Sequence, residues 1–121
     1  MKLEILEYEF SVCQIKNTKQ VDFSREYVFL SKTADEISLV CETDCVPQNT
    51  VAYKHGWKAL KVSGVLEFDM VGVIAKISNT LAQIDISIFV ISTYNTDYIL
   101  LKTESFDKGV QALTLNGYVV V

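Results

Sequence analysis

Apolar residues recur at intervals of three and four between residues 71 and 84, with polar residues between them. The apolar positions are Ile74, Ile77, Leu81 and Ile84, and the polar ones are Lys76, Asn79, Thr80 and Gln83. This spacing places the two kinds on opposite sides of a helix and predicts an amphipathic helix over residues 71–84. Asp69 stands where the side chain of a capping residue would begin that helix.

Strand-like stretches lie on both sides of this helix. Residues 58–66 predict a strand before it. Residues 86–94 (ISIFVISTY) and 97–104 (DYILLKTE) are rich in the β-branched and aromatic residues that favour strands. Asn95 and Thr96 are typical of a tight turn, so the last two stretches predict a hairpin.

A second helix and a last strand complete the pattern. Ser105 is a typical capping residue, and Phe106, Val110 and Leu113 would share one face of the helix that follows. Asn116-Gly117 predicts the end of this helix, and YVVV at residues 118–121 predicts a strand. The order strand–helix–strand–strand–helix–strand indicates an α+β, ferredoxin-like βαββαβ fold.

The first half of the chain repeats part of this plan. Residues 8–15 (YEFSVCQI) predict a strand, and residues 20–27 predict at most a short helix. FLSKTADEISLV overlays VISTYNTDYILL at an offset of 61 residues, which places Ser31 on Ser92 and Glu36 on Asp97 and suggests an internal repeat. The polar stretch around Pro47 separates the halves. We therefore expect two units, residues 1–54 with reduced helices and residues 55–121.

Composition narrows the classes of function. Half of the 121 residues are apolar, so the chain can bury a core. The formal net charge is −4 and no stripe of Lys and Arg is present, which disfavours binding to nucleic acid or to an anionic membrane. No apolar run approaches the roughly 20 residues of a membrane span, and the first residues lack the pattern of a signal peptide. We expect a cytoplasmic protein.

Few residues suit catalysis or metal binding. His55 is the only histidine and stands beside Gly56 in an expected linker. Cys13, Cys41 and Cys45 make an odd number of cysteines, which is typical of reduced thiols. The spacing of the cysteines and the histidine matches no common zinc pattern, and the five glycines form no phosphate-binding loop. The sequence therefore predicts no catalytic residue, no metal site and no cofactor.

The start of the first predicted helix is a candidate binding site. The unpaired N–H groups and the partial positive charge of a helix N-terminus together bind a carboxylate well. Gly72, expected in the first turn between Val71 and Val73, would let a ligand approach the backbone. The same glycine could instead give room for packing of the helix on the sheet.

Polar residues also gather at the predicted hairpin. The hydroxyl of Ser92 or Thr93 could bind a carboxylate, and Asp97 could hold an ammonium or guanidinium group. These residue types are equally common in turns that bind nothing. Both interpretations stay open at the level of the sequence.

These residues resemble a known family. The stretch from Trp57 to Lys102 is similar to the small ACT-domain proteins of the amino-acid-sensor group, which includes the C-terminal half of the animal cytosolic arginine sensor. FDMVGVIAKI resembles the loop-and-helix signature of the family, and ISIFVISTYNTDYILLK resembles its hairpin. Many ACT domains have a proline before the glycine, where this chain has Val71.

The resemblance implies an ACT domain preceded by a divergent ACT-like unit, and a non-catalytic sensor that binds an amino acid between ACT units. By position, it assigns ligand contacts to Asp69, Val71, Gly72 and Val73 and to Ser92, Thr93 and Asp97. It also implies a homodimer and an effector enzyme as partners. Two alternatives stay open: a structural dimerisation module that has lost its ligand site, and a regulatory partner of an amino-acid biosynthetic enzyme such as aspartate kinase.

Overall fold

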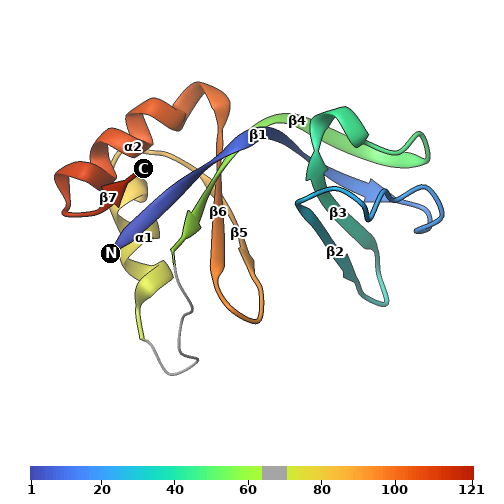
Figure 1. The fold of residues 1–121 in the computed structure, drawn as a ribbon, viewed down its shortest axis with the longest axis horizontal. Coiled ribbons are helices and arrows are strands. Elements are labelled where there is room, and N and C mark those ends of the chain that lie inside the picture. Colours follow the sequence, from blue (N-terminus) through green and yellow to red (C-terminus); the bar gives the residue numbers. More distant parts are fainter. Residues whose placement is uncertain (64–70) are drawn as a thin grey trace. The chain divides into compact units, whose positions relative to one another are not determined.

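The computed structural model describes residues 1–63 and 71–121 (Figure 1). The chain forms two compact units, one made of Met1–Glu7 with Lys58–Val121 and the other of Tyr8–Trp57. Asp69, expected to cap the first helix, and the last residues of the strand expected over 58–66 lie outside the described residues. No helix in the described ranges is long and apolar enough to cross a membrane.

The unit that contains the C-terminal half has the predicted order of elements. They are the end of β4 (Thr50–Val62), α1 (Val73–Ala82), β5 (Ile88–Ser92), β6 (Asp97–Lys102), a 3-10 turn η2 (Thr103–Ser105), α2 (Phe106–Leu115) and β7 (Val119–Val120). This order is βαββαβ, and its strands belong to one sheet in which β5 and β6 are antiparallel. The prediction of an α+β, ferredoxin-like fold is therefore confirmed.

The first residues of the chain add a strand to this unit. β1 (Lys2–Ile15) pairs in parallel with β7, with Lys2 opposite Val119. The backbone N–H of Ser63 donates to the carbonyl of Lys2 at 3.0 Å, which ties the end of β4 to the other side of β1. The last strand, β7, thus pairs with β1 and not with β4. The sequence did not predict this pairing, because its pattern indicated a first strand only from residue 8.

Helix α1 is shorter than its apolar pattern predicts. It begins at Val73, and its N-cap is Gly72, whose φ of 81° and ψ of 11° lie in the left-handed region. The prediction of a helical Val71 and Gly72 is wrong because a left-handed residue cannot belong to a right-handed helix, and the N-cap position belongs to Gly72 and not to Asp69. The helix ends at Ala82, and Asp85, three residues later, has a φ of 58°.

The ends of α2 agree better with the sequence. Ser105 is its N-cap residue as predicted, although its side chain makes no capping hydrogen bond. At the other end Asn116 is the C-cap residue, and Gly117 follows with a φ of 93°, a conformation that glycine adopts at little cost. The predicted stop of the helix at Asn116-Gly117 is confirmed.

The core of this unit lies between the two helices and one face of its strands. Alternate residues of β4 and β6 point into it, and both helices contribute their predicted apolar faces. Its buried members are Leu3, Leu60, Val62, Ile77, Leu81, Ile86, Ile99, Leu101, Phe106 and Leu113. Val110 and Ile74, which the periodicity also places on the apolar faces, pack against this core and are partly buried.

The other unit is built from strands and short turns. It contains most of β1, β2 (Val28–Lys32), β3 (Ile37–Glu42), the 3-10 turn η1 (Thr43–Cys45) and the start of β4, and its strands follow the order β2-β3-β1-β4. Residues 20–27 form turns and not a short helix. Arg25 ties these turns to β3 and η1 through hydrogen bonds to the carboxylates of Glu42 and Asp44, at 3.5 and 3.1 Å.

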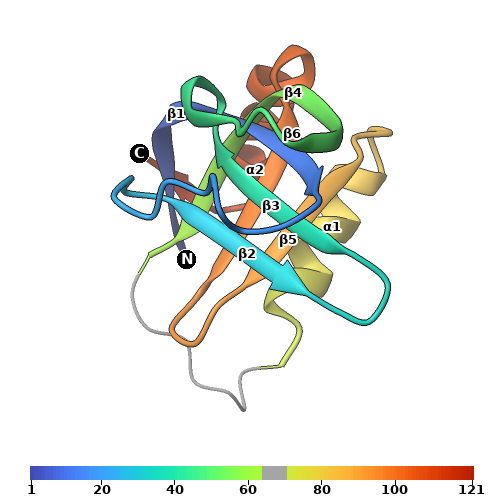
Figure 2. The same cartoon turned by 90° about the vertical axis from the view of Figure 1, so that its right-hand side faces the viewer.

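The two hairpins of the chain repeat at an offset of 60 residues, and Figure 2 shows each of them: β2–β3 and β5–β6. Both turns close in the same way, with Thr33 N–H donating to Glu36 at 2.9 Å and Thr93 N–H donating to Thr96 at 2.8 Å. The overlay at 61 residues is therefore wrong by one position, so Ile37 and not Glu36 corresponds to Asp97. The overlay was misplaced because it aligned Ser31 with Ser92. The equivalent turn residues Thr33 and Thr93 give the correct alignment.

The repeat stops after the 3-10 turns. η2 continues into α2, but η1 is followed by Val46, whose φ of −61° and ψ of 126° are extended. Pro47 comes next, and proline disfavours the helical conformation in the residue before it. This proline gives a physical reason why no α-helix follows η1. That residues 1–54 are a divergent ACT-like unit stays a prediction.

Replacement of Gly109 tests the packing of α2. A methyl group at this position would overlap the Leu101 side chain and contact those of Leu81 and Ile86 at 3.4 and 3.6 Å. We expect Gly109→Ala to lower the free energy of unfolding by about 1–3 kcal/mol, because overpacking of a buried site outweighs the helical preference of alanine. Urea denaturation measures the free energy of unfolding of this variant. Gln111→Ala, at an exposed position of α2, is the control. An alanine variant as stable as the wild type would contradict this packing.

Candidate functional site

The start of α1 has open space beside its half-buried N-cap residue, Gly72. Gly72 carries no side chain, so the N-cap residue cannot satisfy the first N–H groups of the helix. A methyl group built on Gly72 would meet nothing within 4 Å. Packing against the sheet therefore does not explain this glycine, whereas its left-handed conformation does. The space above it is open to a ligand.

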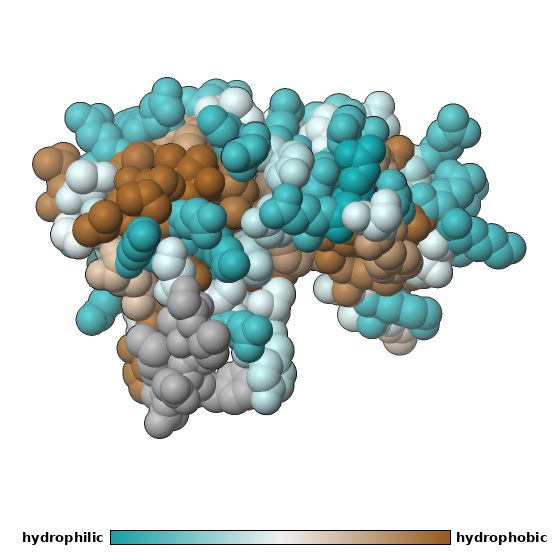
Figure 3. Space-filling view, in the orientation of Figure 1, coloured by the Kyte–Doolittle hydropathy of each residue, from teal (hydrophilic) through white to brown (hydrophobic). Residues whose placement is uncertain are grey.

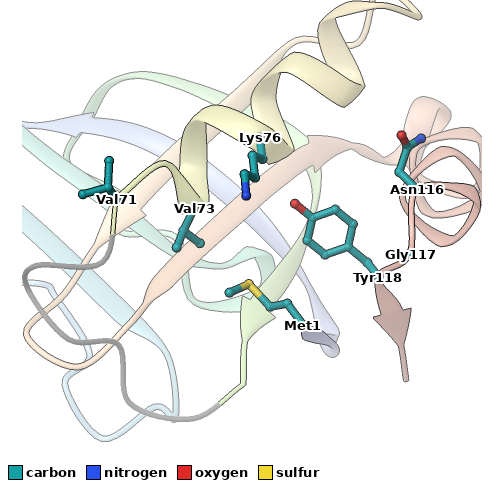
Figure 4. Close-up of a pocket in the computed structure, with 7 residues that line it drawn as sticks. All are labelled: Met1, Val71, Val73, Lys76, Asn116, Gly117 and Tyr118. Atoms are coloured by element: carbon teal, nitrogen blue, oxygen red, sulfur yellow. The ribbon is translucent and has the colours of Figure 1, made fainter.

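A pocket of about 300 Å³ lies beside this helix start (Figure 4). One wall comes from the first turns of α1 and the other from the connection between α2 and β7. The residues with apolar side chains are Met1, Val71 and Val73. The remaining lining residues are Lys76, Asn116, Gly117 and Tyr118. The volume is at the lower end of the roughly 300–1,000 Å³ typical of small-molecule sites.

Backbone hydrogen bonds hold the second wall in place. The N–H of Tyr118 donates to Leu113 at 3.1 Å, and the N–H of Val119 donates to Met1 at 3.0 Å. The side-chain amide of Asn116 donates to the carbonyl of Ala112 at 2.8 Å and so closes the end of α2. The wall is thus a fixed part of the helix terminus and not a free loop.

Two polar groups face the pocket from opposite walls. Lys76 lies one turn after Val73 on α1, and Figure 4 shows its ammonium group and the Tyr118 hydroxyl pointing toward one another. Burial raises the pKa of Tyr118 above its ordinary value, so its hydroxyl stays protonated near neutral pH. Lys76 and Tyr118 therefore both offer hydrogen-bond donors to the pocket.

The pocket includes only part of the residues predicted from the sequence. Val71 and Val73 line it, and Gly72 lies between them. Asp69 lies outside the described residues. The sequence reasoning did not propose Lys76, Asn116 and Tyr118 as site residues. It placed the lysine on the polar side of the helix, where the structure also finds it exposed, and the tyrosine in a strand.

The other predicted residues lie at the β5–β6 hairpin and do not line the pocket. Ser92 and Asp97 are opposite each other at the end of the ladder, and the Thr93 hydroxyl donates to the carbonyl of Thr96 at 3.0 Å. The buried Thr96 hydroxyl donates to the carbonyl of Val62 at 2.7 Å, which anchors the turn to β4. A ligand-binding role for Ser92, Thr93 and Asp97 stays a prediction.

His55 lies within β4 and not in a linker, which corrects the expectation from the sequence. Its Nδ1 atom is 2.6 Å from the hydroxyl oxygen of Ser11, and that oxygen also lies 2.8 Å from the Thr43 hydroxyl. A serine hydroxyl at hydrogen-bond distance from a histidine is also the arrangement of a catalytic nucleophile and its general base. Ser11, however, has no exposed surface, so no substrate can reach its hydroxyl. The contact joins β1 and β4 and carries no catalytic geometry.

The cysteines form no reactive or metal-binding site in the described part of the chain. All three thiols are free, and those of Cys13 and Cys41 are buried. The Cys41 thiol donates a hydrogen bond to Cys13, which raises the pKa of Cys41, together with burial, and lowers that of Cys13. Burial raises the pKa of Cys45. Raised pKa values make Cys41 and Cys45 slow to react at neutral pH, and Cys13 is only 3% exposed, so reagents cannot reach it. Within residues 1–63 and 71–121, no three His, Cys, Asp or Glu side chains are placed to share a metal ion.

Substitution of Gly72 tests the left-handed start of α1. We expect Gly72→Ala to lower the free energy of unfolding by about 1 kcal/mol, because a Cβ atom disfavours this backbone conformation. Gly72→Asn should cost less, since asparagine visits the left-handed region more readily. Thermal and urea unfolding of both variants measure which of them is the more stable. An alanine variant more stable than the asparagine variant would argue against a left-handed residue here.

Comparison with known proteins identifies a family and similar structures for this fold. Residues 52–114, just over half of the chain, match the family model of the ACT domain. The protein Atu0741 from Agrobacterium tumefaciens has a similar structure, with a TM-score of 0.86 and 27% identity over 99% of this chain and 91% of that one. Aspartate kinase from Clostridium acetobutylicum shares the fold at a TM-score of 0.61 and 16% identity, over 88% of this chain and 32% of the kinase.

A third similar structure is described as a putative C-terminal regulatory domain of aspartate kinase from Porphyromonas gingivalis. It matches with a TM-score of 0.56 and 16% identity over 93% of this chain and 91% of that one. At this level of identity the two kinase structures show a common fold. The match over residues 52–114 reaches from β4 through α1 and the β5–β6 hairpin into α2, which is most of the βαββαβ unit. The chain belongs to the ACT domain family.

Proposed function

We propose that this chain is a non-catalytic regulatory module that binds an amino acid or a similar small metabolite at the start of α1. The pocket beside this helix start carries the proposal, because it combines an open helix N-terminus with hydrogen-bond donors and an apolar wall. Membership of the ACT family supports it. The likeness in fold to a regulatory domain of aspartate kinase is consistent with a regulatory role.

A carboxylate is the natural group for the helix start. The first N–H groups of α1 and its dipole favour a negative charge near Gly72. Because Gly72 presents no side chain and no neighbouring atom fills the space at its Cβ position, a ligand can approach the backbone closely. Ligand binding would then stabilise the first turn of α1 and the left-handed conformation of Gly72 that precedes it.

A second copy of the chain would complete this site. Ser92 ends β5, Thr93 lies in the turn that follows and Asp97 begins β6, and none of the three lines the pocket. β5 ends the strand order and so offers an edge to another chain. In a homodimer these polar residues can reach the ligand of the partner subunit, with Asp97 holding its ammonium group. Ligand binding then favours one arrangement of the two subunits over another, which is how a regulator passes its signal on to an effector enzyme.

A structural dimerisation module is the second candidate, and the apolar surface favours it. Figure 3 shows apolar surface over α2 and β7, where Leu115, Val119 and Val121 are 81%, 57% and 55% exposed. Exposed apolar residues gathered in one region are typical of surfaces that another protein covers. In that case the chain associates without any ligand.

Thermal unfolding in the presence of each of the twenty amino acids tests the first candidate. We expect at least one of them at millimolar concentration to raise the melting temperature by about 4 °C or more, because a ligand at roughly tenfold its Kd stabilises the folded state by about 1.4 kcal/mol. Asp97→Ala should reduce this response, whereas Asp107→Ala, in the first turn of α2, should retain it.

The same measurements separate the two candidates. If no amino acid raises the melting temperature while the chain still forms dimers in sedimentation experiments, the structural module is correct and the sensor is not. If Asp97→Ala retains the full response, the contribution of the hairpin is refuted while ligand binding itself stands.

A further inference from the structure

The charges around the pocket beside α1 point to a more specific ligand, and this inference rests on the function proposed above. We infer that the pocket selects a carboxylate with an apolar body and rejects ligands with a cationic side chain. Lys76 would hold the carboxylate, with the Tyr118 hydroxyl as a second donor, and Val73 with the tyrosine ring would contact the apolar body.

Lys76 gives the pocket a positive charge that nothing in the described chain neutralises. It is the one charged side chain among the described lining residues. The ion pairs found in the described ranges all belong to Arg25, in the other unit. Helix α1 itself contains no acidic residue that could pair with the lysine one turn away. The side chain of Lys76 is exposed, so its ammonium group is accessible to an anionic ligand.

The hydrogen-bonding groups show the same preference. The Lys76 ammonium group can only donate, and the protonated Tyr118 hydroxyl can also donate to a ligand in the pocket. One of the two side-chain N–H groups of Asn116 already donates to the carbonyl of Ala112. The open N–H groups at the start of α1 add further donors on the other side. A surplus of donors suits a carboxylate, which only accepts hydrogen bonds when it is ionised.

The size and the apolar wall limit the rest of the ligand. A volume of about 300 Å³ suits a molecule of amino-acid size and not a nucleotide. Val71, Val73 and Met1 present alkyl groups, and no described lining residue offers a carboxylate for a guanidinium or a side-chain ammonium group. Arginine and lysine would bring a second positive charge close to Lys76, which repels it. Leucine and similar apolar carboxylates fit both the hydrogen-bond donors and the apolar wall of the pocket.

Calorimetric titration of the full chain with four compounds tests this selectivity. Leucine has all the expected features, 4-methylpentanoate lacks its ammonium group, isopentylamine lacks its carboxylate, and arginine adds a cation. We expect leucine and 4-methylpentanoate to bind, and isopentylamine and arginine to bind at least about tenfold more weakly, because each loses or opposes a charge-assisted hydrogen bond.

Three variants separate the contribution of Lys76 from those of other side chains. Lys76→Met keeps the length and helical preference of the side chain and should weaken binding of leucine and of 4-methylpentanoate by about tenfold or more. Lys108→Met, which removes an exposed charge from α2, is the matched control and should bind as the wild type does. Tyr118→Phe should weaken binding by a smaller factor, about threefold to tenfold, since it removes one neutral donor.

The outcomes distinguish this inference from the function on which it rests. If arginine or isopentylamine binds as tightly as leucine, or if Lys76→Met binds leucine as the wild type does, the selectivity is refuted while an amino-acid-binding function stands. If none of the twenty amino acids binds at about 10 mM and 4-methylpentanoate does not bind either, both the selectivity and the amino-acid-binding function are refuted. Weak binding of the two cationic compounds together with loss of leucine binding in Lys76→Met would establish the role of the lysine.

Discussion

The packing of α1 and α2 against one face of the strands determines where every residue of the candidate site lies. Ile77 and Leu81 from α1 and Leu113 from α2 are fully buried against Leu60 and Leu101. Burial of each such side chain contributes about 1.5–3 kcal/mol, so the two helices cannot shift independently of the sheet. Gly109 lets α2 approach Leu101 closely. As a result, the start of α1 and the end of α2 form two facing walls, and a pocket remains between them.

The first residues of the chain take part in the same arrangement. β1 pairs with β7, and the carbonyl of Met1 accepts a hydrogen bond from the N–H of Val119 at 3.0 Å. Tyr118 immediately precedes this strand and lines the pocket. The ACT unit is therefore completed from both ends of the sequence. Removal of residues 1–7 would disturb the pocket wall, although these residues lie far from it in the chain.

Local patterns in the sequence predicted the fold well and the site only in part. The periodicity of Ile77 and Leu81, the composition of the β5–β6 strands and the stop at Gly117 each depend on neighbouring residues, and the structure confirms all three. The start of α1 was misplaced because apolar spacing cannot show that Gly72 is left-handed. Lys76 and Tyr118 meet only through tertiary packing, and no local pattern carries that information.

The central claim is that a small carboxylate binds in the pocket between α1 and the end of α2. Nitrogen–proton correlation NMR of the labelled chain during a titration with leucine tests it most directly, because each backbone amide reports on its own surroundings. We expect the largest shifts at the amides of Val73, Lys76, Gly117 and Tyr118, with little change at Thr33 or Glu36 in the β2–β3 hairpin. Shifts confined to the hairpins, or no shifts at all at millimolar leucine, would contradict it.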